Sequence, residues 1–222
     1  MVSNITDLLK PKRKGNYKDG PGRPPGRKNN RTLELEEASQ KAAARIDKAF
    51  DGDAHAFRWV CFQRSLSPAH LKAFLEGLSD FDDIEAEEKA LDFVQNHSSF
   101  HEALIFLTNW PALDRAARLV LDRSREADGN HYDIFTPVAD ALAEKYPLAA
   151  TLALRTMIDF ALNQARTKRY RHAARHLMDC ENLATRIEDF GAHEDHQAFE
   201  DRIRDQHGRK SSFWSLIDLG GP

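Results

Sequence analysis

Helix-start signals recur along most of this chain with only short breaks between them. Ser67-Pro68 places a capping residue before a proline at the first helical position, and Tyr146-Pro147 repeats the arrangement with an aromatic residue. Asp82-Asp83 and Ser98-Ser99 precede further stretches of helix-forming residues. No segment shows the alternation of apolar and polar residues that is typical of a half-buried strand. The chain is therefore predicted to be all-α.

The expected helices fill the intervals between these signals. Thr32 is placed to cap a helix over 34–50, and others are expected to begin at Pro111 and at Thr136-Pro137. Asp128-Gly129-Asn130 is expected to form a turn. The last three helices are expected over 170–186, over 195–206 and around Phe213. Short loops between amphipathic helices favour antiparallel neighbours, as in a bundle or an α-solenoid.

A weak internal repeat favours the solenoid. Trp110-Pro111 recurs 36 positions later as Tyr146-Pro147, and aromatic residues open the intervening helices at Phe100, Tyr132 and Tyr170. The helices after the two X-Pro pairs carry small residues at expected packing positions: Ala116, Ala117, Ala149, Ala150 and Ala153. A period near 35 residues is typical of tetratricopeptide-like helical hairpins. Helices of similar length can also produce such recurrences by accident.

Charge divides the chain into a basic N-terminal arm and an acidic body. Residues 1–32 hold nine basic and two acidic residues, a net charge of +7, whereas residues 33–222 hold 23 basic and 33 acidic residues, a net charge of −10. Residues 11–31 contain four prolines and four glycines, with Tyr17 as the only large apolar residue. The arm over 1–32 is therefore predicted to be disordered, and the helical-repeat domain to occupy 33–222. A polyanionic partner is expected for the arm alone.

One segment of the arm resembles an AT-hook, a motif that binds the minor groove of A·T-rich DNA. Gly22-Arg23-Pro24 matches its core: proline keeps the backbone extended, glycine allows close approach, and arginine suits a narrow, negative groove. Pro21 stands where the motif has another arginine, which lowers the expected affinity and A·T preference. The alternative is a basic linker without sequence preference. The predicted DNA-contacting residues are Lys12, Arg13, Lys14, Gly22, Arg23, Pro24, Arg27 and Lys28.

A second candidate site lies near the C-terminal end. Arg209 and Lys210 precede Phe213 and Trp214, and this mixture of positive charge and aromatic rings is typical of grooves that bind peptides or nucleic acids. These four residues are therefore candidates for contacting a partner. The alternative, which we favour, is that the two aromatic residues cap the open end of the helical repeat, because terminal repeats need a cap.

Residues that could support catalysis or metal binding do not form a recognisable site. His172, His176 and Cys180 share a helix face and suit zinc, but they span about 12 Å along the helix, too far for one ion. Ala173 follows His172, so the zinc-protease motif HExxH is absent. The sequence also lacks a P-loop, a GxGxxG and a Gly-x-Ser-x-Gly elbow. We therefore predict no cofactor, no metal and no enzymatic activity.

Three segments of the C-terminal half carry a resemblance to known proteins: 146–162 (YPLAATLALRTMIDFAL), 169–191 (RYRHAARHLMDCENLATRIEDFG) and 193–217 (HEDHQAFEDRIRDQHGRKSSFWSLI). They resemble an uncharacterised bacterial domain family that is similar to the helical-repeat tail of SWIM-type zinc-finger proteins. The resemblance covers roughly residues 60–217. It implies an α-helical repeat fold, no assigned activity and a link to nucleic-acid-associated proteins. The zinc-binding CxC…CxH motif is absent, so no zinc site is implied.

These observations favour an interaction protein. The sequence has no apolar run of the 18 or so residues that a membrane helix needs, and Cys61 and Cys180 are too few for a disulfide framework. The predicted location is the bacterial cytoplasm, with association with the nucleoid through the arm. The leading hypothesis is a non-enzymatic adaptor whose arm contacts A·T-rich DNA and whose body binds an unidentified protein, with no membrane and no small-molecule substrate. The alternative is a protein–protein scaffold with no DNA role.

Overall fold

The chain divides into two units, Met1–Asp51 and Gly52–Pro222, and the second holds nearly all the residues that the structure describes. The computed structural model describes residues 37–38, 41, 52, 54–79 and 81–218. The predicted arm over 1–32, with all of its DNA-contacting residues, lies outside them. So do nearly all of the helix expected over 34–50 and the predicted domain boundary between residues 32 and 33.

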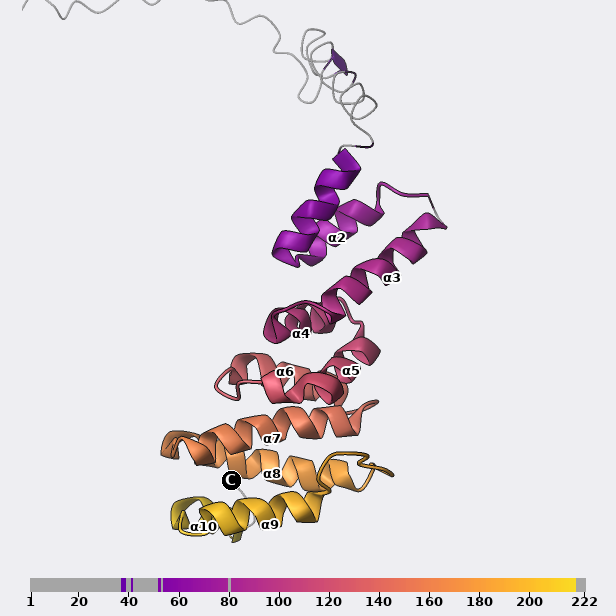
Figure 1. Ribbon diagram of the computed structural model, residues 1–222. Helices are drawn as coiled ribbons and strands as arrows, with labels where there is room; N and C mark the ends of the chain where they lie inside the picture. Colours follow the sequence, from indigo (N-terminus) through magenta and orange to yellow (C-terminus); the bar gives the residue numbers. More distant parts are fainter. Residues whose placement is uncertain (1–36, 39–40, 42–51, 53, 80, 219–222) are drawn as a thin grey trace, which may run out of the picture. The chain divides into compact units, whose positions relative to one another are not determined.

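Every regular element in the described part of the chain is a helix, which confirms the all-α prediction (Figure 1). Helical residues 54–65 come before α2. The α-helices that follow are α2 (Pro68–Leu75), α3 (Asp82–Gln95), α4 (Phe100–Asn109), α5 (Leu113–Arg123), α6 (Tyr132–Leu142), α7 (Pro147–Asn163), α8 (Tyr170–Ala184), α9 (His196–His207) and α10 (Ser211–Asp218). Short 3-10 helices, Ser124–Glu126 and Thr167–Arg169, follow α5 and precede α8. Among the described helices, none is long and apolar enough to cross a membrane.

Several helix starts lie where the local sequence signals predict them. Ser67-Pro68 supplies the N-cap and the first residue of α2. Ser99 caps α4, and its hydroxyl oxygen accepts a hydrogen bond from the Glu102 N–H at 3.4 Å. Phe100 and Tyr170 are the first residues of α4 and α8, as predicted. These starts were predictable because a cap and its helix are neighbours in sequence.

Helix α6 begins at Tyr132, so the expected start at Thr136-Pro137 is wrong and the aromatic start is confirmed. The Phe135 N–H already donates to the carbonyl of His131 at 3.0 Å, ahead of the proline. Phe135 is buried beside Phe100, with ring centres 6.4 Å apart, and this packing favours an additional helical turn. Pro137 therefore lies inside the helix, where it supplies no N–H to the backbone ladder.

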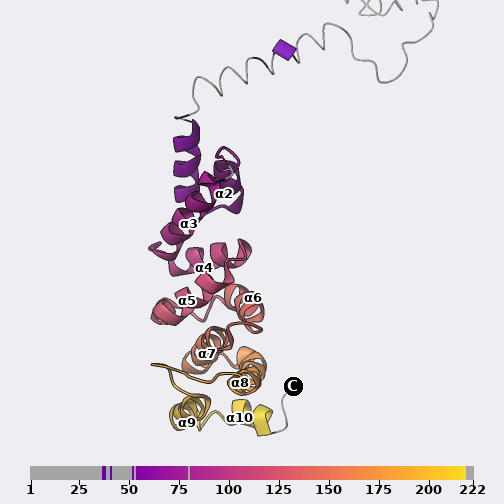
Figure 2. The ribbon, with the colours of Figure 1, turned by 90° about the vertical axis from the view of Figure 1, so that its right-hand side faces the viewer.

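Alternate helices contact one another in addition to their neighbours in sequence. Helix α3 packs on α5, α4 on α6 and α5 on α7, and the helices follow one another in chain order (Figures 1 and 2). At the C-terminal end of α5, Arg123 donates to the carbonyls of Gln95 and His97, at 3.2 and 2.8 Å. These carbonyls lie at the C-terminal end of α3. Because the two C-terminal ends meet, α3 and α5 run in the same direction and the intervening α4 runs back.

Helix α7 is central to the C-terminal half of this unit. It contacts α5, α6 and α8, and buried residues lie along most of its length. The alanines predicted at packing positions are indeed buried: Ala116, Ala117, Ala149, Ala150 and Ala153. Small side chains let neighbouring helices approach α7 closely from several directions. Helix α7 therefore forms the base on which α6 and α8 rest.

Arg155 of α7 is a deeply buried charged residue, with 4% of its surface exposed. Its guanidinium donates to the backbone carbonyls of Glu194 at 2.6 Å and Asp195 at 3.1 Å. The Asp195 carboxylate in turn caps α9 by accepting a hydrogen bond from the Ala198 N–H at 2.7 Å. Arg155 thus connects α7 to the start of α9.

Candidate functional site

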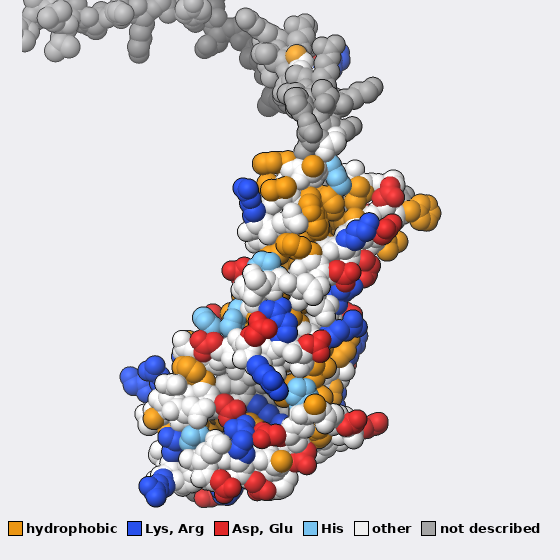
Figure 3. Space-filling view, viewed as in Figure 1, with side chains coloured by type: hydrophobic (Ala, Val, Ile, Leu, Met, Phe, Trp, Pro, Cys, Tyr) orange, Lys and Arg blue, Asp and Glu red, His pale blue; other side chains and the backbone are white. Residues whose placement is uncertain are grey.

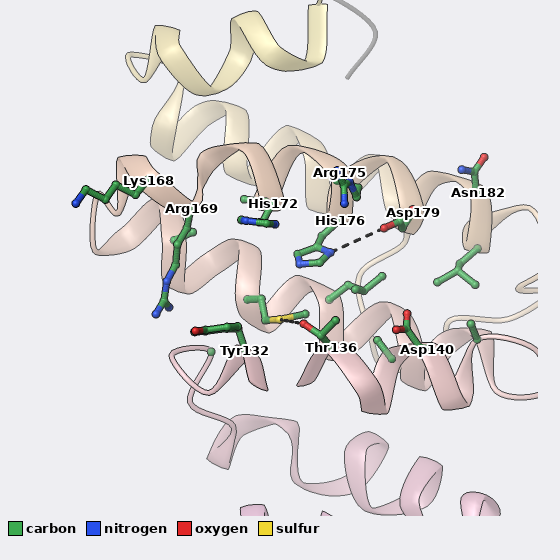
Figure 4. Close-up of a pocket in the computed structure, with 18 residues that line it drawn as sticks. Tyr132, Thr136, Asp140, Lys168, Arg169, His172, Arg175, His176, Asp179 and Asn182 are labelled. Carbon is green, nitrogen blue, oxygen red and sulfur yellow. Dashed lines mark hydrogen bonds and ion pairs between the residues drawn. The ribbon is translucent and has the colours of Figure 1, made fainter. Parts of the chain in front are cut away.

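A groove of about 860 Å³ opens between α6 and α8 (Figure 4). A hollow of this size can hold several amino-acid residues or a small ligand. The lining residues come from the turn before α6 and from α6, α7, α8 and the 3-10 helix before α8: Gly129, Tyr132, Thr136, Ala139, Asp140, Ala143, Leu154, Met157, Ala161, Lys168, Arg169, His172, Ala173, Arg175, His176, Asp179, Asn182 and Leu183.

The floor of the groove is apolar. Leu154 and Met157 of α7 lie at its base and are 6% and 5% exposed. Thr136 of α6 faces them, and its hydroxyl lies 3.7 Å from the sulfur of Met157. The alanines of α6, α7 and α8 that line the groove have short side chains, which leave its interior open. Such a floor can bury an apolar side chain of a bound molecule.

The wall formed by α8 carries polar and charged side chains on one helical face. Lys168, His172, Arg175, Asp179 and Asn182 all line the groove, and they follow one another at intervals of four, three, four and three residues. Lys168 lies in the 3-10 helix that precedes α8, and the spacing of the other four places them in a row along one face of α8. The row is positively charged near the start of α8 and carries an acid and an amide near its end.

At the start of α8 the two walls are bridged by Arg169. Its guanidinium lies 4.8 Å from the centre of the Tyr132 ring and 5.4 Å from that of Phe160. It also lies 3.5 Å from the carbonyl of Asn130, to which it donates. Stacking of arginine on an aromatic ring is favourable, so this contact holds the start of α8 against the start of α6.

At the other end the walls are bridged by Arg186, which follows α8. Its guanidinium donates to the carbonyls of Ala143, at 3.0 Å, and Glu144. These carbonyls follow the last turn of α6, whose acceptors have no partner within the helix. The contact also shows that α6 and α8 run in the same direction, because their C-terminal ends meet.

The turn before α6 approaches α7 very closely at Gly129. A Cβ atom added there would lie 2.1 Å from the Thr156 carbonyl oxygen and 2.7 Å from the Cβ of Phe160. The Asp128 carboxylate closes the turn by accepting a hydrogen bond from the Asn130 N–H at 2.9 Å. The predicted Asp128-Gly129-Asn130 turn is therefore confirmed, and glycine is needed because the backbones nearly touch.

His176 and Asp179 form a pair on the α8 wall. The His176 Nδ1 lies 3.8 Å from a carboxylate oxygen of Asp179. Burial lowers the pKa of His176, and the neighbouring His172 and Arg175 lower it further against the opposing effect of Asp179. The His176 ring is therefore largely neutral near pH 7. Asp140 faces this pair from α6 (Figure 4), so the later part of the groove carries two carboxylates.

The His172, His176 and Cys180 set does not come together. The two histidines line the groove, whereas Cys180 is fully buried, with its sulfur 3.8 Å from the Thr151 carbonyl oxygen. Burial raises the pKa of the Cys180 thiol to about 12, and only the thiolate is a strong metal ligand. In the part of the chain that the structure describes, no group of three or more His, Cys, Asp or Glu residues is placed to hold a metal ion.

At the C-terminal end, Phe213 and Trp214 are buried, 0% and 6% exposed. Phe213 lies edge-on to Tyr170 of α8, with ring centres 5.8 Å apart. The Trp214 Nε1 donates to the His207 carbonyl at 3.0 Å, and Arg204 stacks on the indole at 4.2 Å. The packing of both rings agrees with the capping interpretation. Exposed Arg209 and half-buried Lys210 remain candidates for contacting a partner.

A comparison with known protein families gives a match over residues 25–216, to a family of unknown function, DUF6880. The chain belongs to this family. The match agrees with the prediction that the chain belongs to an uncharacterised family. The matched residues include all those that line the groove. Comparisons with curated proteins and with solved structures gave no match.

The groove was not predicted from the sequence, although one signal for it was present. In this DUF6880 protein, the row from His172 to Asn182 on α8, preceded by Lys168, is visible as a polar stripe at helical spacing. The sequence interpretation instead selected His172, His176 and Cys180, at intervals of four residues. The opposite wall is formed by α6, whose predicted start at Thr136-Pro137 was too late. The floor depends on the packing of α7 beneath both helices.

Proposed function

We propose that this DUF6880 protein is a non-enzymatic interaction protein whose groove between α6 and α8 binds a segment of a partner protein. The observation that carries the proposal is the groove itself, an apolar floor with a charged row on one wall. This combination buries apolar side chains and orients them through polar contacts, as peptide-binding surfaces do.

The length of the groove favours a chain segment over a compact ligand. Its lining on the α8 side runs from Lys168 to Leu183. Fifteen residues of helix correspond to about 22 Å, which is the length of about six or seven extended residues. The proposal includes an α-solenoid built from the helical hairpins, because stacked hairpins of this kind present extended surfaces to partners.

A second part of the proposal concerns the N-terminal arm and rests on its sequence. Gly22-Arg23-Pro24 and the net charge of +7 over residues 1–32 favour contact with A·T-rich DNA. The arm would then act as a tether that raises the local concentration of the groove near DNA-bound partners. Its site of action would be the bacterial nucleoid, in line with the resemblance to SWIM-type proteins. Without DNA binding, the protein is a scaffold alone.

Selection from a random peptide library tests the groove. The full chain is used as bait, and selected peptides are then measured by fluorescence anisotropy against Thr136→Trp. That substitution fills the groove above Met157, so we expect affinity to fall at least tenfold. The control is Ser215→Trp on α10, which is exposed and outside the groove. Equal binding by Thr136→Trp and the unmodified chain would place the peptide site elsewhere.

Binding to A·T-rich and G·C-rich duplexes across a salt series tests the arm. We expect Arg23→Ala in the full chain to remove the preference for A·T-rich DNA, since Arg23 is the groove-inserting residue of the motif. Lys12→Ala should weaken binding to both duplexes alike and reduce the salt dependence by about one phosphate contact. If the unmodified chain binds neither duplex, the scaffold alternative holds.

A further inference from the structure

The positive charges that line the groove lack the carboxylate partners that several other arginines of this unit have. Four arginines elsewhere are held by carboxylates within the unit: Arg115, Arg123, Arg202 and Arg204. In the described part of the chain, Lys168, Arg169 and Arg175 form no ion pair. The acidic body has carboxylates in excess, yet these three side chains line the groove without an ion-pair partner among the described residues.

We propose that the groove binds an acidic peptide segment, whose carboxylates lie against Lys168, Arg169 and Arg175 and whose apolar side chains lie on Leu154 and Met157. This inference rests on the groove function proposed above and specifies the chemistry of its occupant. Charge complementarity supports it, because a carboxylate supplies the partner that these cations lack.

The spacing of the cations fits a peptide. Lys168, in the 3-10 helix before α8, and Arg175, on α8, are seven residues apart, which is about 10 Å along the chain axis. In a peptide with the polyproline II conformation, acidic residues three positions apart lie on one face and are separated by a similar distance, about 9 Å. Arg169 is already stacked on Tyr132, so its planar guanidinium is fixed in place for an incoming carboxylate.

The later part of the groove gives the peptide a direction. Asp140 and Asp179 lie near the end of the cation row (Figure 4). Acidic residues of the peptide should avoid this end, where a neutral or basic residue is favoured. The acidic end of the segment is therefore expected near the start of α8 and its other end near Asn182.

The same charges disfavour a nucleic acid in the groove. Lys and Arg side chains are interspersed with Asp and Glu over the face of the unit that Figure 3 shows, and residues 33–222 carry a net charge of −10. A phosphate backbone carries a charge at every step and would meet Asp140 and Asp179 as well as the cations. A peptide can confine its charges to one end and still bury apolar side chains on the floor.

Three peptide series with the same apolar positions and with Glu, Gln or Lys at the variable positions test this inference on the full chain. We expect the Glu series to bind at least tenfold more tightly than the Gln series, and the Lys series to bind most weakly. Arg175→Glu should remove the preference for Glu. The control is Arg171→Glu, on the same helix but exposed and outside the groove lining, which should keep it.

The other outcomes separate this inference from the groove function. If the Gln or Lys series binds as tightly as the Glu series, and Thr136→Trp abolishes that binding, the groove function stands and the acidic occupant is wrong. If a single-stranded oligonucleotide competes for the site and loses affinity with Arg175→Glu, the occupant is a nucleic acid. If no series binds at all, the groove function fails together with the inference.

Discussion

The guanidinium of Arg155 lies 4.4 Å from the centre of the Phe199 ring, which joins the middle of α7 to the first turn of α9. Arg155 is buried, and burial lowers its pKa, but an arginine remains protonated at neutral pH. Two backbone carbonyls and the aromatic face stabilise the charge without a carboxylate hydrogen bond, and the buried Nε has no hydrogen-bond partner among the described residues. The stability of the protein should therefore depend strongly on the side chain at position 155.

Arg155→Ala should therefore destabilise the protein strongly. The substitution removes two charged hydrogen bonds and the contact with Phe199, and leaves two carbonyls without these donors. We expect a loss of about 2–5 kcal/mol in the free energy of unfolding, measured by urea denaturation. Exposed Arg166 provides the control, since Arg166→Ala should change stability by about 0.5 kcal/mol or less. Similar losses for the two variants would contradict this account.

Gly129→Ala should also destabilise, because a Cβ atom has no room there. The added atom would lie 2.1 Å from the Thr156 carbonyl oxygen, so the turn before α6 must move away from α7. Overpacking of this kind costs about 1–3 kcal/mol. Gly52→Ala is the control: no atom lies within 4 Å of its added Cβ, and alanine favours a helix. Thermal unfolding of both variants checks the prediction. A Gly129→Ala variant as stable as the unmodified chain would contradict it.

Trp214→Ala tests whether the C-terminal aromatic residues hold the fold together. Trp214 is buried and is contacted by Arg204 and by the carbonyl of His207. We expect a loss of about 3–5 kcal/mol, as for other large buried side chains. Arg209→Ala should leave stability nearly unchanged, since that side chain is exposed. A stable Trp214→Ala variant that no longer binds a partner would favour the partner-contact interpretation instead.

Stability should fall on mild acidification, partly through His101. Its Nε2 accepts a hydrogen bond from the Asp128 N–H at 3.2 Å and therefore must be unprotonated. Burial lowers the pKa of His101 from 6.5, and His131 lowers it further, while Asp128 raises it. Below pH 6.5 the unfolded chain binds more protons than the folded one, so the free energy of unfolding falls until the folded pKa is passed.

Urea midpoints at about pH 7.5 and pH 5.5 measure this effect. His101→Gln can still accept from Asp128 but does not titrate, so its midpoint should change less with pH than that of the unmodified chain. Burial also lowers the pKa of His176, His196 and His207, and a part of the pH dependence should therefore persist in the variant. An identical pH dependence in both proteins would exclude His101 as a contributor.

Cys180 should be inert in the folded protein. Burial raises the pKa of its thiol to about 12, so very little thiolate forms near pH 8. In a Cys61→Ser variant, which leaves Cys180 as the single thiol, Ellman's reagent should react only as fast as the protein unfolds. Addition of urea should then release the reaction. Rapid labelling without denaturant would show that Cys180 is accessible.

Much of the fold followed from local sequence signals, and the site did not. Ser67-Pro68, Ser99 and Tyr146-Pro147 mark helix starts because capping involves residues a few positions apart. The Thr136-Pro137 signal was misleading because α6 begins before the proline, where Phe135 packs beside Phe100. That contact joins residues more than thirty positions apart in the sequence, so no local pattern could predict it.

The groove was harder to predict because its walls and floor come from three helices. The row on α8 is visible in the sequence, but its meaning depends on α6 lying opposite and on α7 closing the base. Cys180 shows the reverse case: it shares helical spacing with His176, yet its side chain is buried in the core. A helical period identifies a face, and only the packing of neighbours decides whether that face is buried, solvated or open to a partner.

Arg169 and Arg186 bridge the two ends of the groove, one to Asn130 and Tyr132 and the other to Ala143 and Glu144. These contacts fix the width of the groove in the unbound protein. A preorganised site loses little conformational entropy on binding, so modest contacts can yield useful affinity. Binding should then resemble rigid docking, with weak dependence of the association rate on loop motions and a dissociation rate governed by the contacts inside the groove.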